Sequence, residues 1–317
     1  MKVTKTPRIA MLIPYFGKWP EWMSLYLYTC SRNPQIDFHF FTDCSIPQQT
    51  YVNTFFHGMT FDEYRAKAKA LTGLDIPGHT DKLCDLRPFF GRIHRDVIDA
   101  GSYQWWGFGD IDVAYGDCAQ LVNPTRNPHI ELVTSHIYQL AGHFCIIKCG
   151  SVAFDNFQPT DEMRRIIEAD PAGFIDEVHY SRAIRPRRMC LIDKLWFAIG
   201  LRVKWERNSF YRLMDRILPG KRLNAYYCDP STTFDPIPGE KYILDLSTMR
   251  WTMGKGHFQG CLRPRSNMPY LHFLKFKKCA NNKTDFHWPQ DYYKIPANHQ
   301  WQGNEKVEIT LEHIKLV

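Results

Sequence analysis

Three aspartates, Asp110, Asp112 and Asp117, follow one of the most apolar runs of the chain in the stretch WWGFGDIDVAYGD. On an extended backbone, residues i and i+2 point to the same side, so the carboxylates of Asp110 and Asp112 would converge. Converging negative charges repel each other unless a cation lies between them. Oxygen ligands suit a hard divalent ion such as Mg²⁺ or Mn²⁺ that also binds a diphosphate. The pattern predicts a metal–diphosphate site, and the alternative is a pair of exposed turn aspartates.

The surrounding sequence favours the metal site over the turn alternative. The apolar segment 103–112 has the composition of a buried strand, and open α/β sheets bind ligands at the carboxyl ends of their strands. Gly107 and Gly109 precede the pair and allow another backbone to approach closely. Asp117 has a separate expected role, in which it caps the following segment or holds the loop.

The elements that must position these carboxylates begin with a β–α–β unit. Residues 8–17 contain a continuous apolar run, which is typical of a strand buried on both faces of a parallel sheet. Residues 19–33 have helical spacing, and residues 36–43 form a second strand pattern that ends in Thr42 and Asp43. This order predicts an α/β protein with a sheet of the nucleotide-binding type.

Further helices and strands follow. Thr60 and Gly73 cap a helix at its two ends, and Thr160 caps the start of another. A helical region over residues 81–101 is interrupted near Pro88. We expect more strands over residues 103–112, 129–136, 142–150 and 305–314. The pattern loosens in the last third of the chain, which favours one compact α/β domain with a C-terminal extension.

Composition places the chain among folded globular proteins, because 44% of its 317 residues are hydrophobic and 23% are charged. Its net charge of +7 is a mild excess that lies in three basic runs, residues 185–188, 207–222 and 275–278. These runs fit either a solvated mixed surface or a patch for nucleotide phosphates, anionic lipids or lipid-linked acceptors. They match no nucleic-acid-binding module, so nucleic acid is not an expected partner.

The ten cysteines have no disulfide-framework or metal-knuckle spacing, and we expect reduced cytosolic thiols. Pro14 breaks the short apolar run after the basic start, which predicts a first strand and not a signal peptide. The sequence contains no window of roughly 18 apolar residues, so no transmembrane helix is expected. We therefore expect a cytoplasmic protein, whose basic runs offer peripheral contact with the inner face of the cell membrane.

Five segments in order carry a family resemblance. They are DKLCDLRPFFGRIH (81–94), WWGFGDIDVAYGD (105–117), AGHFCIIK (141–148), IDEVHYS (175–181) and YLHFLK (270–275). Over about residues 7–278 the chain resembles a family of bacterial sugar transferases from capsule and lipopolysaccharide O-antigen gene sets, formerly a domain of unknown function. The resemblance implies a GT-A, Rossmann-like fold with a mixed, mainly parallel sheet flanked by helices. It also implies a nucleotide-sugar donor and a divalent metal.

The resemblance assigns the metal-binding residues. Asp110 and Asp112 match the Asp-x-Asp pair that binds Mn²⁺ or Mg²⁺ in such enzymes. His272 matches a C-terminal histidine that completes the site, and imidazole suits Mn²⁺ better than Mg²⁺. From the sequence alone, His272 also fits a core histidine in the apolar string 270–276. Lys275 would neutralise the leaving diphosphate, and its alternative is a surface lysine in a basic run.

Five residues at the ends of the first two strands are the expected nucleotide contacts. They are Pro14, Tyr15, Phe16, Thr42 and Asp43. An aromatic ring would stack on the base, and a hydroxyl or a carboxylate would bind uracil or ribose. Ordinary core packing is the alternative for Tyr15 and Phe16.

The helical region contributes Lys82, Asp85 and Arg87 to the expected donor site. Lys82 and Arg87 would contact phosphate, and Asp85 would contact the sugar. Because Lys82 and Asp85 are three residues apart and share a helix face, a structural ion pair between them is the competing interpretation.

An inverting transfer needs a carboxylate or a histidine that takes the proton of the acceptor hydroxyl. The candidates are Asp176, Glu177 and His179, of which Glu177 is the preferred base and Asp176 its neighbour. His143 and His179 are expected to contact the donor or the acceptor. A retaining enzyme would need no such base, because the leaving phosphate can accept the proton.

The expected GT-A-type domain covers residues 1–278, with a nucleotide-sugar half over 1–118, an acceptor half over 119–278 and an extension over 279–317. It would move a hexose from a UDP-sugar to a lipid-linked or other glycan acceptor in bacterial surface polysaccharide synthesis. One alternative is a nucleotidyl- or phosphotransferase, although residues 13–22 lack the Gly-rich phosphate loop that it would need. The other is a non-catalytic sugar- or lipid-binding protein.

Overall fold

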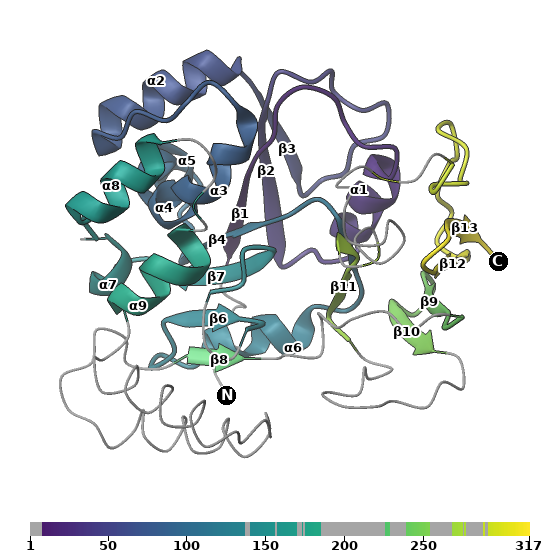
Figure 1. The fold of residues 1–317 in the computed structure, drawn as a ribbon. Helices are drawn as coiled ribbons and strands as arrows, with labels where there is room; N and C mark the ends of the chain where they lie inside the picture. The colour runs from purple at the N-terminus through teal and green to yellow at the C-terminus, as the bar shows by residue number, and fades with distance from the viewer. Residues whose placement is uncertain are drawn as a thin grey trace, which may run out of the picture.

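Figure 1 shows the fold of the chain as a computed structural model. It describes residues 8–136, 140–155, 157–169, 173, 175–184, 226–228, 239–253, 268–274, 276, 288 and 291–317. The basic side chains of the three runs, Lys275 among them, lie outside the described residues. Their expected contacts therefore stay predictions.

A seven-stranded sheet in the order β3-β2-β1-β4-β7-β6-β8 forms the centre of the molecule. Its strands are β1 (Ile9–Pro14), β2 (Ile36–Thr42), β3 (Thr54–Gly58), β4 (Trp105–Gly109), β6 (Leu132–Thr134), β7 (Phe144–Lys148) and β8 (Tyr226–Cys228). The first four pair in parallel, β6 and β8 are also parallel, and β7 runs antiparallel to both β4 and β6. The predicted mixed, mainly parallel sheet is confirmed.

Helices flank the sheet, as predicted. Thr60 starts α2 through a capping box with Glu63, and Gly73, with φ of 70°, ends it. The predicted helical region over residues 81–101 is broken around Pro88 into short pieces. The helices are α1 (Met23–Ser31), α2 (Phe61–Thr72), α3 (Leu83–Leu86), α4 (Phe90–Ile93), α5 (Arg95–Ala100), α6 (Ala119–Val122), α7 (Val152–Asp155), α8 (Asp161–Glu168) and α9 (Ser181–Ile184), with 3₁₀ turns at Thr80–Lys82, Arg87–Phe89 and Asn123–Arg126 and a π-helix at Ile175–Tyr180.

Burial of both faces explains the continuous apolar sequence of β1. Ile9, Met11 and Ile13 pack in one hydrophobic cluster with α1, whereas Ala10 and Leu12 pack in a second cluster with α2, α4, α5 and α8. Successive side chains of a strand point to opposite faces, so a strand that is covered on both sides has no polar positions. Figure 1 shows α1 on one side of the sheet and the other four helices opposite.

The Asp-x-Asp pair lies in a bend after β4 and not on an extended backbone as the sequence predicted. After the bend, β5 (Val113–Tyr115) pairs antiparallel with β11 (Tyr270–His272). In this pairing Val113 is opposite His272, and the backbone N–H of Phe273 donates to the carbonyl of Asp112 at 3.0 Å. The small sheet thus brings a distant part of the chain to the bend.

Gly107 of β4 lies where the backbone of β7 approaches too closely for a larger residue. A Cβ at this position would collide with the backbone carbonyl of Cys145 in β7. The close backbone approach that the sequence predicted is therefore made by the neighbouring strand, and it keeps β7 tight against β4.

The C-terminal residues form a second sheet in the order β10-β9-β12-β13. Its strands are β9 (Tyr242–Asp245), β10 (Arg250–Met253), β12 (Lys306–Ile309) and β13 (Ile314–Leu316). The single strand expected over residues 305–314 is instead parts of two strands, because the hydroxyl of Thr310 accepts two backbone N–H groups and fixes a tight turn. Trp301 stacks on Tyr28 of α1 with ring centroids 5.5 Å apart, which anchors the extension to the main sheet layer.

Two smaller predictions concern the state of the cysteines and the presence of a transmembrane helix. Six cysteines are free thiols in the structure, namely Cys30, Cys44, Cys84, Cys118, Cys145 and Cys149. Within the described part of the chain, no helix has the length and apolar character needed to cross a membrane.

Candidate metal centre and its surroundings

Asp110, Asp112 and His272 meet at the carboxyl end of β4. The Nε2 atom of His272 lies 3.3 Å from Oδ1 of Asp112 and 3.9 Å from Oδ2 of Asp110. His272 is 5% exposed, and among the described residues neither of its ring nitrogens has a hydrogen-bond partner. A buried imidazole that faces two carboxylates in this way fits a divalent cation held by all three side chains. We call these residues the metal triad.

The charge environment of the metal triad also fits a cation. Burial raises the pKa of the Asp110 carboxyl, the nearby Arg87 guanidinium lowers it, and the Asp112 carboxylate raises it again, with a net upward shift. A bound cation would offset the repulsion between the two aspartates. Asp117 lies outside the triad, and its Oδ1 accepts the backbone N–H of Ala119 at 2.8 Å, which fixes the turn before α6 and fits the expected role of holding the loop.

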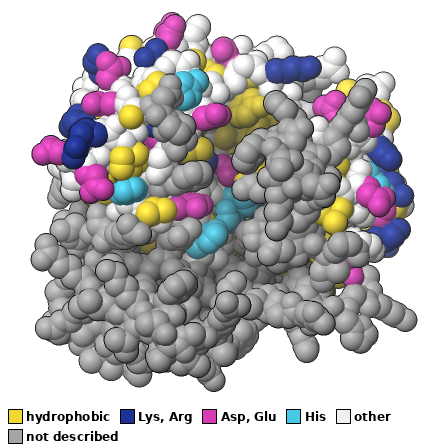
Figure 2. Space-filling view, viewed as in Figure 1, with side chains coloured by type: hydrophobic (Ala, Val, Ile, Leu, Met, Phe, Trp, Pro, Cys, Tyr) yellow, Lys and Arg dark blue, Asp and Glu magenta, His cyan; other side chains and the backbone are white. Residues whose placement is uncertain are grey.

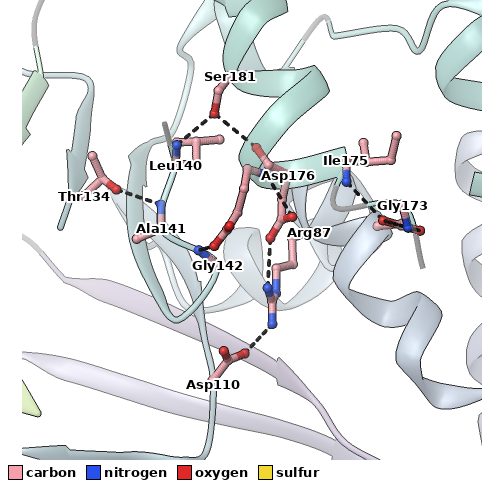
Figure 3. Close-up of polar contacts among 12 residues, drawn as sticks. Arg87, Asp110, Thr134, Leu140, Ala141, Gly142, Gly173, Ile175, Asp176 and Ser181 are labelled. Carbon is pink, nitrogen blue, oxygen red and sulfur yellow. Dashed lines mark hydrogen bonds and ion pairs between the residues drawn. The ribbon is translucent and has the colours of Figure 1, made fainter. Parts of the chain in front are cut away.

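Arg87 connects the metal triad to the π-helix, as Figure 3 shows. One terminal nitrogen of its guanidinium donates to Asp110, and the other lies 2.8 Å from Oδ2 of Asp176. Burial on its own would lower the pKa of Arg87, but the carboxylates of Asp110 and Asp176 raise it well above its ordinary value. The side chain of Asp176 is 1% exposed, so this ion pair supplies its counter-charge.

Lys82 and Asp85 form a fully buried ion pair, with Nζ and Oδ2 2.7 Å apart. Asp85 also accepts the backbone N–H groups of Gly173 at 2.9 Å and Ile175 at 3.1 Å, at the start of the π-helix (Figure 3). The structure therefore agrees with the competing interpretation, in which Lys82 and Asp85 form a structural ion pair. The predicted contacts of Lys82 with phosphate and of Asp85 with sugar do not fit side chains that have no exposed surface.

Glu177 is held at the first turn of the π-helix. Its Oε1 accepts the backbone N–H of Gly142 at 3.1 Å. A Cβ at Gly142 would collide with the guanidinium of Arg87, so glycine lets the π-helix and the start of β7 meet at this point. Burial raises the pKa of the Glu177 carboxyl, and the neighbouring Asp176 raises it further. A half-buried carboxylate with a raised pKa is a candidate proton acceptor.

His143 precedes β7 and adjoins the metal triad. Its ring stacks on that of His272, with centroids 4.1 Å apart and an angle of 16° between the ring planes. His179 lies two residues beyond Glu177 on the π-helix and is partly exposed. Figure 2 shows histidine and acidic side chains gathered near the middle of this face. Contact of either histidine with a substrate stays a prediction.

The aromatic residues after β1 have two different surroundings. The half-buried ring of Tyr15 stacks on Trp19, with centroids 5.1 Å apart and planes inclined by 10°. Phe16 is buried against Phe61 and Tyr64, so it belongs to the core, and its predicted contact with a nucleotide base is wrong. Tyr15 stays a candidate for that contact.

The other residues at these strand ends shape loops. The hydroxyl of Thr42, which is buried, accepts the backbone N–H of Cys44 at 3.0 Å, and this bond fixes the turn after β2. Asp43 is exposed, and its Oδ1 accepts the backbone N–H of Gly17 at 2.7 Å. Pro14 ends β1 and is partly exposed. Of these three, Asp43 and Pro14 present surface that a nucleotide could contact, whereas Thr42 does not.

Three residues were not among the site residues predicted from the sequence, namely Trp19, Ser135 and His136. Trp19 belongs to a segment that was interpreted only as a helix start, and the two others end a segment that was interpreted only as a strand. The available signal was an aromatic or polar side chain directly after the carboxyl end of a strand, the position where α/β sheets bind ligands.

The family assignment comes from the sequence. Residues 11–219 match a family described as "Family of unknown function (DUF6625)". The chain belongs to this family. The match covers two residues of the metal triad and ends before His272. No curated protein matches this DUF6625 chain.

Three solved structures are similar to the DUF6625 chain at a low level. A glycosyltransferase involved in the glycosylation of the major capsid of PBCV-1 is 14% identical with a TM-score of 0.31, over 71% of this chain and 84% of that one. The glycosyltransferase GlyE of Streptococcus pneumoniae TIGR4 is 10% identical with a TM-score of 0.30, over 71% of this chain and 45% of that one, so the chain spans less than half of its length. Mouse xyloside xylosyltransferase 1 is 9% identical with a TM-score of 0.31, over 51% and 72%. Likenesses this low carry no argument about the reaction, which must come from the residues of the site.

Proposed function

We propose that the chain is a metal-dependent glycosyltransferase of the GT-A type, which moves a sugar from a nucleotide-sugar donor to a hydroxyl of a glycan acceptor. The observation that carries this proposal is the convergence of Asp110, Asp112 and His272 at the carboxyl end of a central strand of an α/β sheet. This is the place where such sheets bind ligands, and the three side chains form a donor set for a divalent cation.

Two carboxylates and one imidazole suit Mn²⁺ well and Mg²⁺ less well. A divalent cation, when bound, stabilises negative charge on a leaving diphosphate. Arg87 places a guanidinium beside the Asp110 carboxylate of the triad, where it can pair with donor phosphates. Tyr15, stacked on Trp19 at the carboxyl end of β1, offers an aromatic face to the base.

Glu177 is the proposed base, and Asp176 is not, because Asp176 is buried and paired with Arg87. Glu177 would take the proton of the acceptor hydroxyl while that oxygen bonds to the anomeric carbon and the bond from this carbon to the diphosphate oxygen breaks. In this arrangement Asp176 positions Arg87, and His143 and His179 contact the donor sugar or the acceptor.

The sequence resemblance supports a more specific setting. We propose a UDP-hexose donor and a lipid-linked or other glycan acceptor of bacterial surface polysaccharide synthesis, at the cytoplasmic face of the membrane. One alternative is a nucleotidyl- or phosphotransferase, and the other is a non-catalytic binding protein, which the experiment below distinguishes.

The test is release of free nucleotide from UDP-, GDP- and CMP-sugars by the purified chain in the presence of Mn²⁺. We expect turnover of a UDP-sugar, a loss of about 100-fold or more in Asp112→Asn, and little change in Asp117→Asn, which alters a carboxylate of the same loop outside the triad. Binding of a nucleotide-sugar without turnover would favour the non-catalytic alternative, and equal turnover in Asp112→Asn would contradict a metal-dependent reaction.

A further inference from the structure

A second group of ligand-type side chains lies beside the metal triad. His136 follows β6, His143 precedes β7 and Glu177 lies on the π-helix, so three separate elements converge. One ligand atom from each of the three residues lies within 4.8 Å of the other two. We infer that these residues form a second metal site, selective for Zn²⁺ and similar transition metals, and call it the His–His–Glu cluster.

The donor set distinguishes the two sites. Two imidazoles and one carboxylate are a common ligand set for Zn²⁺, which leaves a fourth position open. The metal triad has the reverse composition, two carboxylates and one imidazole, and so suits the harder ions Mn²⁺ and Mg²⁺. Ligand atoms in zinc sites lie about 2.0–2.2 Å from the metal, so binding would require the three side chains to rotate inward around the ion.

Two of the three ligands are already oriented by neighbouring groups. The Nε2 atom of His143 lies 3.0 Å from the hydroxyl of Ser135, and the ring is 3% exposed. An outer hydrogen bond of this kind typically fixes the ring of a metal-binding histidine. The Oε1 atom of Glu177 accepts the N–H of Gly142. The cluster is thus held in place from its outer side.

The charges around the cluster also favour a bound cation. The stacked rings of His143 and His272 have centroids 4.1 Å apart, so the cluster directly adjoins the metal triad and its two carboxylates. The carboxylates of Asp110 and Asp176 act on Glu177 in the same region, and each adds negative charge that a cation would offset.

Zinc bound at the cluster would have a consequence for the proposed reaction. A Glu177 carboxylate that ligates Zn²⁺ cannot take the proton of an acceptor hydroxyl. Zn²⁺ should therefore inhibit transfer while Mn²⁺ supports it. This consequence rests on the proposed function, whereas the site itself does not.

The test is calorimetric titration of the chain, prepared without a histidine tag, with Zn²⁺ in the presence of excess Mg²⁺. We expect one tight Zn²⁺ site in the wild type, affinity reduced about 10-fold or more in His136→Gln, and unchanged affinity in Asp112→Asn. The control is His129→Gln, which alters an exposed histidine outside the cluster and should bind Zn²⁺ as the wild type does.

Visible absorption of bound Co²⁺ provides a second measurement that does not depend on activity. The wild type and Asp112→Asn should give the intense bands of a four-coordinate site with nitrogen ligands, and His136→Gln should lose them. Wild-type Zn²⁺ affinity in a folded His136→Gln variant would overturn the inference. So would the absence of a tight site in the wild type, or a site that is lost in Asp112→Asn and kept in His136→Gln. None of these outcomes depends on whether nucleotide-sugars are turned over.

Discussion

Asp176 and Glu177 are neighbours on the π-helix, but their surroundings differ, and we assign their roles from this difference. Asp176 is almost fully buried, and its Oδ2 lies 2.8 Å from the Arg87 guanidinium in a structural ion pair. Glu177 is half-buried and has a raised pKa, and it receives a backbone N–H on one oxygen. A carboxylate kept at a raised pKa is the better proton acceptor, so the proposed base is Glu177.

Removal of this base is the first prediction at the residue scale. Glu177→Gln should keep donor binding and lose about 10²- to 10⁴-fold in transfer, because glutamine cannot accept the proton. The wild-type rate should fall as the pH decreases through the raised pKa of Glu177, since protonation removes the base, and the variant should lack this fall. Initial rates and donor affinity, both measured across pH, check the two effects.

The matched control is Glu162→Gln, which alters an exposed glutamate at the start of α8. It should transfer at the wild-type rate with the wild-type pH profile. Transfer by Glu177→Gln at the wild-type rate would rule out the base role and would point to a retaining reaction in which the leaving phosphate accepts the proton.

Individual residues were predictable where chemistry decides their role. The structure brings Asp110, Asp112 and His272 together, as the family resemblance implied. Phe16 was not predictable, because only the packing of α2 against the sheet decides that an aromatic ring after β1 faces the core. The resemblance likewise named Arg87 as a phosphate contact but could not show its bridge between Asp110 and Asp176, which depends on the position of the π-helix.

At the scale of elements, the buried pair Lys82–Asp85 anchors the π-helix. Asp85 accepts two backbone N–H groups at the start of that helix, and Lys82 donates to the carbonyl of Ile166 in α8 at 2.9 Å. Three elements, α3, α8 and the π-helix, therefore depend on one ion pair. A buried charge that loses its partner is costly, so this pair is a sensitive point of the fold.

Asp85→Asn should lower the free energy of unfolding by about 3–5 kcal/mol, because it leaves the Lys82 ammonium buried without its counter-charge. The double variant Lys82→Met with Asp85→Leu should recover part of this loss, since neither charge is then buried. Denaturant unfolding measures all three proteins.

The control is Asp99→Asn, which breaks the exposed Arg95–Asp99 pair of α5 and should cost less than about 1 kcal/mol. An Asp85→Asn protein as stable as the wild type would show that the buried pair is not the anchor described above.

Elements with strong local signals were predictable, and those set by distant contacts were not. The Thr60 cap and the break near Pro88 are local, and both were predicted from the sequence. The turn that divides residues 305–314 depends on hydrogen bonds to the Thr310 hydroxyl. It was not predicted, because the alternating pattern of these residues resembles one continuous strand. The π-helix depends on Asp85, which lies far away in the sequence.

At the scale of the whole molecule, the candidate site depends on the joining of remote segments. The continuous apolar run of β1 predicted a sheet covered on both faces, and this part of the fold followed from the sequence. The pairing of β5 with β11 did not follow, because a three-residue strand has too weak a pattern to show its partner. That pairing delivers His272 to the two aspartates.

The most direct test of the central claim is an electron paramagnetic resonance titration of the chain with Mn²⁺, in which protein binding removes the signal of the free ion. We expect one site in the absence of nucleotide, weakened about 10-fold or more in both Asp112→Asn and His272→Gln and unchanged in Asp117→Asn. Wild-type Mn²⁺ affinity in a folded His272→Gln protein would contradict the claim that β11 completes a metal site at the end of β4.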